Sequence, residues 1–199
     1  MPDSSPLAPP LILASTSRYR REMLLRLGLP FEVIAPEVDE TPLPGETPAA
    51  LAQRLAFAKA WAVARLRPDA AVIGSDQVAD LDGQAIGKPG SHERAVEQLQ
   101  RMRGRRVIFQ TAVAVVHAEM AFAQCRLAAV QVCFRALSDA EIERYLCLEQ
   151  PYDCAGSAKS EGLGITLLDS ISSDDPTALV GLPLIRTCQL LRLVGIVLP

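Results

Sequence analysis

The chain has 199 residues, of which 49% are apolar and 22% are charged, and it carries a net charge of −3. This length and composition are typical of a globular protein with one sizeable core and argue against a disordered chain. The weakly acidic balance gives no general attraction for nucleic acid, so we expect no nucleic-acid partner. Arginines cluster at 18–26 and 101–106, which leaves open a local basic pocket for a small polyanion.

The first ten residues, MPDSSPLAPP, contain an acid and four prolines but no lysine or arginine. They lack the basic and apolar regions of an export signal, and no apolar run approaches the ~18 residues of a membrane-spanning helix. We therefore expect a cytoplasmic protein without a membrane partner, with a flexible N-terminus at 1–10 and a single domain at 11–199. Five cysteines without a CxxC pair and only two histidines argue against a disulfide framework, a zinc site or a histidine-based triad.

Strand-like and helix-like periodicities alternate along the chain, which predicts an α/β fold. Residues 11–14 form a short apolar strand. Ser17 is a good N-cap for the amphipathic helix that follows, and Gly28 closes this helix before a second strand at 31–35. A strand, a polar turn and a helix N-terminus are therefore expected within twenty residues of one another.

A long helix is predicted from Thr47 to about Leu66, because Pro48 stands at its first position and apolar residues recur at helical spacing. Lys59 falls at the edge of the apolar side, four residues after Leu55. A lysine at such a position either extends to solvent or points into a cleft.

The rest of the chain predicts a mixed sheet, because two long strand-like runs follow one another and would pair antiparallel. The predicted elements are a strand at 70–74, a hairpin around 82–83, a helix capped by Ser91, strands at 107–116 and 130–135, a helix at 138–148 and a C-terminal helix around 184–191. Helices would flank this sheet on its faces. Three polar segments, at 15–21, 39–40 with 76–88, and 156–164, lie beside predicted strands and could converge at one end of the sheet, where ligands usually bind.

The first polar segment, STSRYRR at 15–21, offers hydroxyl groups, the N–H groups of a helix N-terminus and arginine side chains within one turn. All of these suit phosphate oxygens. The alternative is a capped surface helix with solvated arginines.

The second segment brings acids and a lysine close to apolar runs. Asp39, Glu40 and Asp76 are the kind of loop carboxylates that a hard divalent cation prefers, and Asp76 could also take a proton from water. The alternative is that Asp76 caps a turn and that Asp39 and Glu40 are solvated. Lys88 lies in a GKP sequence, and because Pro89 follows it, a P-loop ATPase is excluded.

The third segment places Lys159 and Glu161 among three glycines. A carboxylate here could accept hydrogen bonds from the N–H edge of a base, and guanine offers two such donors side by side. The alternative is a flexible surface loop.

These motifs together resemble one family. They are LASTSRYRREML at 13–24, DE at 39–40, GSDQ at 74–77, GKP at 87–89, KSEGLGI at 159–165 and VGLPL at 180–184. In this order, over about residues 11 to 195, they are similar to the Maf family of nucleotide pyrophosphatases. The resemblance implies an ITPase-like α/β fold with two lobes around a cleft. It also implies hydrolysis of a nucleoside triphosphate to a monophosphate and pyrophosphate, with a divalent cation such as Mg, Mn or Co.

The resemblance also implies roles for individual residues. Asp76 matches the family's proton acceptor, and Glu40, Lys59 and Lys88 match charged residues that line the cleft. The expected metal ligands are Asp76 and Glu40. The expected substrate-binding residues are Ser15, Arg20 and Arg21, which would contact the phosphates, and Lys159.

Three positions distinguish the branches of the family by substrate, and here they are Tyr19, Gln77 and Glu161, as in the branch that acts on 7-methyl-GTP. An enzyme of this kind would remove modified nucleotides before they enter nucleic acids. Arg18 replaces a proline that often stands before the first of these positions. A dTTP/UTP or broad-specificity pyrophosphatase and a non-hydrolysing nucleotide sensor in cell-division control remain alternatives, and a homodimer is expected from the resemblance alone.

Overall fold

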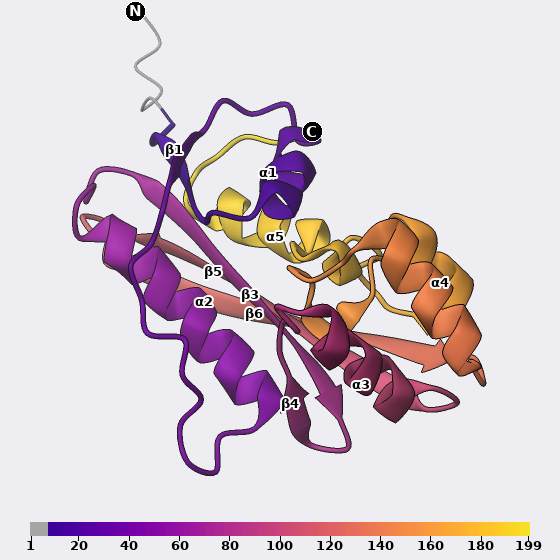
Figure 1. The fold of residues 1–199 in the computed structure, drawn as a ribbon. Helices are drawn as coiled ribbons and strands as arrows, with labels where there is room; N and C mark the ends of the chain where they lie inside the picture. Colours follow the sequence, from indigo (N-terminus) through magenta and orange to yellow (C-terminus); the bar gives the residue numbers. More distant parts are fainter. Residues whose placement is uncertain (1–7) are drawn as a thin grey trace, which may run out of the picture.

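The computed structural model describes residues 8–199 (Figure 1). Most of the N-terminus predicted to be flexible, residues 1–7, lies outside the described residues. The strands are β1 (Leu11–Ala14), β2 (Glu32–Ile34), β3 (Ala71–Leu81), β4 (Gln84–Ile86), β5 (Arg106–His117), β6 (Phe122–Phe134) and β7 (Leu168–Ser172). The helices are α1 (Arg18–Leu25), α2 (Pro48–Ala64), α3 (His92–Met102), α4 (Asp139–Glu149) and α5 (Leu184–Leu193), with short 3-10 turns η1 (Ala155–Ser157), η2 (Leu163–Leu167) and η3 (Ala178–Val180).

The predicted mixed sheet is confirmed. Its order is β2-β1-β3-β5-β6-β7, in which β1 pairs parallel with β2 and β3 and the other pairs are antiparallel. The predicted caps are also present: Ser17, Thr47 and Ser91 each accept a backbone N–H bond at a helix start. Ser138 and Glu141 form the predicted capping box of α4.

One edge of β3 has a gap between its neighbours. On that edge β1 pairs with Ala71–Gly74 and β4 pairs with Ala79–Leu81, while β5 covers the opposite edge. No strand of the described chain pairs with 75–78 on the open edge. Residues of this stretch therefore keep the extended geometry of a strand while one side of it stays accessible to a ligand.

The predicted lengths of β3 and β6 are too short, and β7 was not predicted from the sequence. The prediction that β3 ends at Gly74 is wrong, because β3 continues through Asp76, which pairs with Ala112 of β5. β6 begins eight residues before the predicted 130, and β7 was not predicted. Polar residues interrupt the apolar pattern of these segments, and their extended conformation comes from pairing with β5 and β6 instead.

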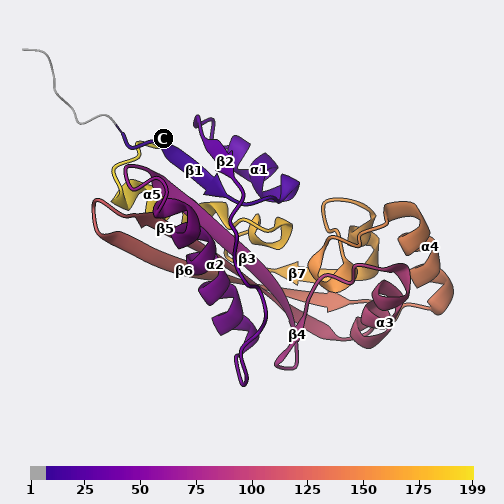
Figure 2. The same ribbon diagram turned by 60° about the vertical axis from the view of Figure 1, so that its left-hand side comes forward.

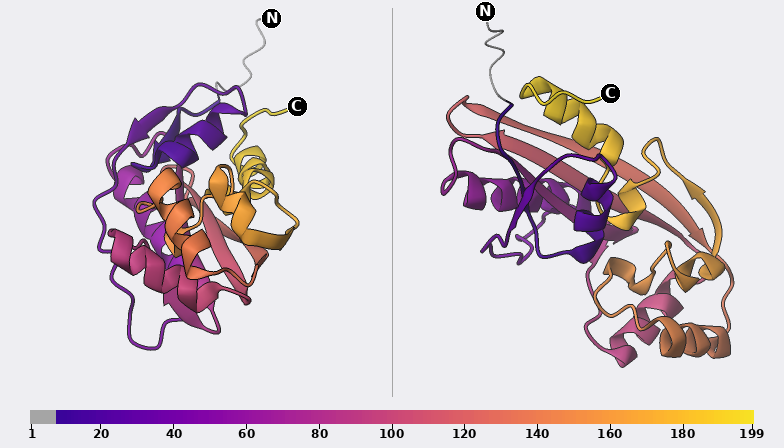
Figure 3. Two further views of the ribbon diagram at one scale, coloured as in Figure 1. Left: turned by 45° about the vertical axis from the view of Figure 1, so that its right-hand side comes forward. Right: turned by 90° about the horizontal axis from the view of Figure 1, so that it is seen from above.

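Helices cover the sheet and divide the molecule into the two lobes that the resemblance implied. α2 packs on one face of the first half of the sheet, and α1 and α5 pack on the other face. α3 and α4 lie together against the far ends of β3, β5 and β6 and build a separate cluster around Phe109 and Phe134. Figures 2 and 3 show this second lobe beside the first, joined to it by the long strands β5 and β6.

Gly74 allows α2 to lie directly on β3. A Cβ atom at this position would be 2.2 Å from the carbonyl oxygen of Ala56 and 2.5 Å from the amide nitrogen of Ala60. Both atoms belong to the α2 backbone, which cannot move without shifting the helix. A residue with no Cβ is therefore required where this helix crosses the strand.

We predict that Gly74→Ala destabilises the protein by about 2 kcal/mol or more, because the new methyl group forces α2 away from β3. Urea denaturation would measure the loss. Gly87→Ala is the matched control, since no atom lies within 4 Å of its added Cβ, and it should change stability by less than about 0.5 kcal/mol. Equal midpoints for the two variants would contradict the close-packing argument.

Candidate active site

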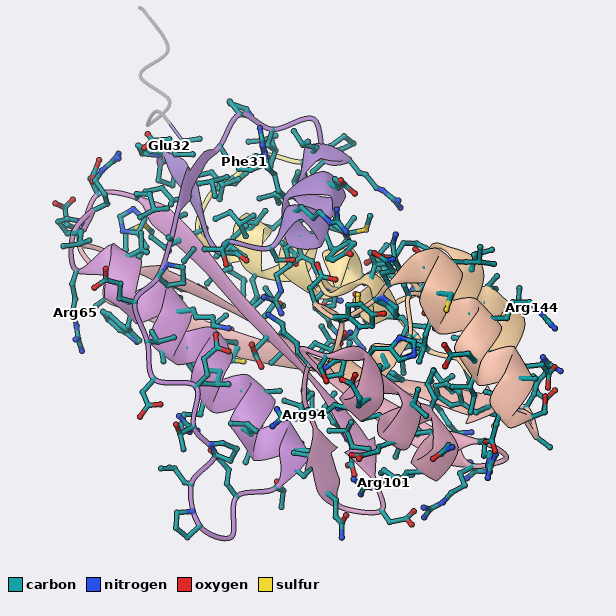
Figure 4. All side chains as sticks on the ribbon, viewed as in Figure 1. Phe31, Glu32, Arg65, Arg94, Arg101 and Arg144 are labelled. Atoms are coloured by element: carbon teal, nitrogen blue, oxygen red, sulfur yellow. The ribbon has the colours of Figure 1, made fainter. Side chains whose placement is uncertain are left out.

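A cavity of about 950 Å³ opens at the gap in the β3 edge, which is large enough for a nucleotide. Nine of the residues predicted for the site line it: Ser15, Tyr19, Arg20, Glu40, Lys59, Asp76, Gln77, Lys88 and Glu161. Arg21 and Lys159 do not line this cavity in the described part of the chain. The arginines at 101–106 do not line it either, and Figure 4 shows Arg101 at the outer surface of α3.

Lys59 is the centre of the charged end of the cavity. Its Nζ donates to Asp76 Oδ1 at 2.6 Å and lies 2.7 Å from Glu40 Oε1. Lys59 and Asp76 are both buried, so this lysine points into the cleft, and Asp76 does not cap a turn. A buried ammonium group must be paired in this way, since an unpaired charge would be very costly.

The second oxygen of Asp76 remains available. Oδ2 accepts no hydrogen bond from residues 8–199, and no buried polar side-chain atom in this range lacks a partner. Oδ2 therefore contacts the solvent of the cavity. A carboxylate with one oxygen bound to Lys59 and the other in contact with water can accept a proton from that water.

Glu40 lies at the mouth of the cavity, where more than half of its side chain is exposed. Partial burial would raise its pKa, but the hydrogen bond from Lys59 and the positive charges of Lys59, Lys88 and Arg20 outweigh burial. The net effect lowers the pKa of Glu40 below its ordinary value, so this carboxyl group is ionised at neutral pH.

Arg20 joins α1 to the turn after η3. Its Nε donates to the carbonyl oxygen of Gly181 at 3.0 Å, and its Nη2 lies 3.9 Å from Asp76 Oδ1. Ser75 Oγ donates to the same carbonyl at 3.1 Å. Burial lowers the pKa of Arg20, and the charges of Asp76 and Glu40 oppose that effect. The guanidinium group is thus held beside the acids with its terminal nitrogens at the cavity.

The N-terminus of α1 forms part of the cavity wall. Ser15 Oγ accepts from the Ser17 amide at 3.1 Å, and Ser17 Oγ accepts from the Arg20 amide at 3.4 Å. The amides of Arg18 and Tyr19 donate to no atom of the described residues, and both residues line the cavity. Two free N–H groups and a helix N-terminus make this wall suitable for an anion.

Tyr19 connects the two lobes at the other end of the cavity. Its hydroxyl group accepts from Arg18 Nη2 at 2.6 Å and donates to Asp153 Oδ1 at 3.3 Å. Burial raises the pKa of Tyr19 to about 12, so the phenol is neutral. The guanidinium carbon of Arg18 lies 4.7 Å from the centre of the Tyr19 ring. Arg18, which departs from the family pattern, therefore contacts the ring of Tyr19, one of the three positions that distinguish the branches of the family.

Glu149 organises the glycine-rich loop that carries Glu161, and sequence reasoning missed it. Its Oε1 accepts from Lys159 Nζ at 2.7 Å, and its Oε2 accepts from the Leu163 amide at 2.7 Å. Gly164 is packed so tightly that a Cβ would be 2.5 Å from the Lys159 carbonyl oxygen. Lys159 binds Glu149 at the end of α4, and of the two charged residues of the loop only Glu161 lines the cavity. Nothing in the local pattern around Glu149 indicates this pairing.

Gln77 lines the cavity but uses its amide group elsewhere. Side chains alternate along β3, so Gln77 points to the face opposite Asp76. Its Nε2 lies 2.9 Å from Thr111 Oγ1, 2.8 Å from the Ala178 carbonyl and 3.1 Å from the Leu179 carbonyl. These contacts hold η3 against the sheet.

Lys88 lies on the segment that follows the β3–β4 hairpin. The predicted turn is present, with positive φ at Asp82 and Gly83. The Gly87 carbonyl accepts from the Gly156 amide at 3.3 Å, and the Gly90 amide donates to the Tyr152 carbonyl at 3.1 Å. The exposed side chain of Lys88 is thus carried on a segment anchored on both sides, close enough to Glu40 to lower its pKa.

The loop that carries Glu40 is held by an ion pair that the sequence did not indicate. Arg54 donates to both oxygens of Glu46, at 2.6 and 2.8 Å, and to the Thr41 carbonyl at 3.0 Å. Glu46 also accepts from the Leu43 amide at 3.0 Å. The hydrogen bond from Arg54 lowers the pKa of Glu46 to about 2.

The acids of the cavity fit the predicted divalent cation as a shared ligand set. Residues 8–199 contain no group of three or more His, Cys, Asp or Glu side chains that could hold a metal by themselves. Asp76 and Glu40 each direct one oxygen to Lys59, which leaves one oxygen on each. Mg²⁺ is commonly bound by one or two carboxylates together with substrate phosphates and water, and this pair provides that number.

The fold and the cavity together define an α/β protein with a cleft for a phosphate-bearing ligand of nucleotide size. The chain belongs to the Maf family: the family model described as "Maf-like protein" matches residues 10–194. It is 69% identical to the "7-methyl-GTP pyrophosphatase" of Polaromonas sp. (strain JS666 / ATCC BAA-500), over 98% of this chain and 89% of the relative.

Two further relatives carry the same name. The protein of Albidiferax ferrireducens is 68% identical over 97% of both chains, and that of Aromatoleum aromaticum is 62% identical over 95% of this chain and 97% of the relative.

Within the part of the chain that the structure describes, no helix has the length and apolar character needed to span a membrane.

We predict that Glu46→Gln lowers stability at pH 7 and that the difference from the wild type shrinks as the pH falls. The pKa of Glu46 is lower in the folded chain than its ordinary value of 4.5, so its stabilising contribution is complete above about 4.5 and is lost as the pH falls toward about 2. Urea midpoints at pH 7, 4 and 3 would measure this.

Glu37→Gln, an exposed change in the same loop, is the control and should behave as the wild type at each pH. A gap between Glu46→Gln and the wild type that stayed constant from pH 7 to 3 would exclude the ion pair as its cause.

Proposed function

We propose that this chain is a nucleoside triphosphate pyrophosphatase that hydrolyses 7-methyl-GTP to 7-methyl-GMP and pyrophosphate. The observation that carries the proposal is the buried Lys59–Asp76 pair at one end of a nucleotide-sized cavity. It stands in a chain whose relatives at 60–69% identity are named 7-methyl-GTP pyrophosphatase.

The charged end of the cavity would hold the triphosphate. Arg20 and the free amides of Arg18 and Tyr19 provide donors for phosphate oxygens. Lys59 and Lys88 place positive charge at the same end, where negative charge develops on the phosphoryl oxygens. Ser15 supports the turn that presents these donors.

Asp76 would act as the general base. Its Oδ2 receives the proton of a water molecule that attacks the α-phosphorus, and the bond to the β-phosphate oxygen breaks, so that pyrophosphate leaves. Lys59 holds the carboxylate through Oδ1 and keeps Oδ2 directed to the water. When bound by Asp76 and Glu40, a divalent cation would supply further neutralisation of phosphate charge and would acidify nearby water.

The opposite end of the cavity suits a cationic base. The 7-methylguanine ring carries positive charge, Glu161 and Asp153 both line the cavity, and Asp153 contacts Tyr19. Glu161 would accept from the N1 and N2 donors of the base. The Tyr19 ring would stack on the base with a cation–π contribution of about 0.5–2 kcal/mol.

The cellular role follows from this activity as part of the same proposal. The protein would remove a modified nucleotide before it enters nucleic acid, and it would work in the cytoplasm, where nucleoside triphosphates are present. The homodimer implied by the resemblance remains a prediction.

We predict that Asp76→Asn reduces kcat for pyrophosphate release at least about 100-fold, because the amide cannot take the proton of the attacking water. Release is measured with Mg²⁺, with Mn²⁺ and without added metal. Asp80→Asn is the matched control, because it makes the same change on the same strand outside the cavity and should keep kcat within about twofold. Equal release by Asp76→Asn and the wild type would remove Asp76 from the mechanism.

We predict that Glu161→Gln lowers the preference for 7-methyl-GTP over UTP about tenfold, measured as the ratio of kcat/KM values. The glutamine keeps one acceptor but loses the charge that pairs with the methylated base. Glu97→Gln, an exposed change on α3 outside the cavity, should leave the ratio unchanged. If Glu161→Gln kept the full ratio, a dTTP/UTP or broad-specificity pyrophosphatase would be favoured.

A further inference from the structure

Tyr152 lines the cavity and belongs to a hydrogen-bonded chain that the proposed reaction does not use. His92 Nδ1 lies 2.9 Å from the Tyr152 hydroxyl group, and His92 Nε2 lies 3.0 Å from Glu143 Oε2. The residues come from three places: the 150–155 segment, the first turn of α3 and the middle of α4. The segment that lines the cavity is thereby tied to both helices of the second lobe.

Glu143, at one end of these hydrogen bonds, determines which atoms donate and which accept. The hydrogen bond from His92 lowers the pKa of Glu143 below its ordinary value, so the carboxylate accepts from Nε2–H. In the neutral imidazole, Nδ1 then accepts from the Tyr152 hydroxyl group. The hydroxyl group of Tyr152 is bound by His92. The aromatic ring is therefore the part of this side chain that can contact a ligand in the cavity.

Tyr152 lies between the segment that carries Lys88 and the side chain of Tyr19. Its carbonyl oxygen accepts from the Gly90 amide at 3.1 Å, two residues after Lys88. The next residue, Asp153, accepts from the Tyr19 hydroxyl group. Tyr152 therefore adjoins both the lysine segment at the phosphate end and the tyrosine at the base end, and its half-buried side chain is part of the lining.

We infer that Tyr152 is a second aromatic contact for the nucleoside part of the substrate, and that His92 and Glu143 are positioning residues that hold its ring. The inference rests on the proposed function only for the identity of the nucleotide. A ring held by its hydroxyl group presents a π surface at low cost in conformational entropy, which suits stacking against a purine or its ribose. None of the three positions belongs to the motifs that the sequence singled out.

Binding can be measured without turnover in the Asp76→Asn background. We compare Asp76→Asn with Asp76→Asn/Tyr152→Ala by isothermal titration with 7-methyl-GTP and with inorganic tripolyphosphate, which lacks the nucleoside. The Kd for 7-methyl-GTP should rise about tenfold or more, as expected for loss of a stacking aromatic ring, while the Kd for tripolyphosphate should stay within about twofold. Tyr152→Leu, which keeps apolar bulk, should give the same pattern and guards against a folding defect in the alanine variant.

Three results would overturn the inference: no change for either ligand, an equal loss for both, or a loss for tripolyphosphate alone. The proposed function has a separate test, since wild-type turnover of a nucleoside triphosphate panel could fail while the nucleoside-dependent loss of binding persists. Conversely, the wild type could turn over 7-methyl-GTP while the Tyr152 variants bind it normally, which would overturn the inference alone.

The positioning role of His92 is tested by a double-mutant cycle in the otherwise wild-type enzyme. His92→Ala and Tyr152→Phe should each raise KM for 7-methyl-GTP a few-fold with little change in kcat, and the double variant should be no worse than the stronger single variant. Additive effects on KM would show that His92 does not act through the tyrosine hydroxyl group. A fall in kcat with unchanged KM would also contradict the role.

Discussion

The buried contact between Lys59 and Asp76 is the interaction on which the site depends. A lysine and an aspartate removed from solvent must be paired with good geometry, and their 2.6 Å contact requires that α2 lie close to β3. Gly74 allows this approach, because any side chain there would collide with the α2 backbone. The absence of a side chain at Gly74, two residues before the proposed base, therefore determines where the charged groups lie.

The second constraint is the gap in the β3 edge. A strand that is paired along both edges offers a ligand only its two faces, whereas 75–78 keep one edge open between β1 and β4. Asp76 can point toward α2 and Gln77 toward η3 while both line one cavity. The same gap explains why the first and second lobes meet at the site: β1 and α1 border it on one side, and β4 with the Lys88 segment borders it on the other.

The groups around the cavity are held mainly by residues outside it. Arg54 and Glu46 hold the loop with Glu40, Glu149 holds the loop with Glu161, and His92 holds Tyr152. The loops that carry Glu40 and Glu161 are therefore fixed by contacts that lie outside the cavity lining. This arrangement also explains the placement of Lys159, whose charge is used to hold Glu149.

The sequence by itself determined the order of the strands and helices except β7, the N-caps of four helices, the hairpin before Lys88 and nine of the residues that line the cavity, because periodicity, caps and motifs are local properties. Only the tertiary structure decided that β3 continues through Asp76, that Gln77 serves η3, and that Arg21 and Lys159 lie outside the cavity lining. It also revealed Arg54, Glu149 and the His92–Tyr152 contact. Each of these depends on contacts between residues far apart in the chain, or on which face of a strand a side chain takes, and neither is encoded in the spacing of neighbouring residues.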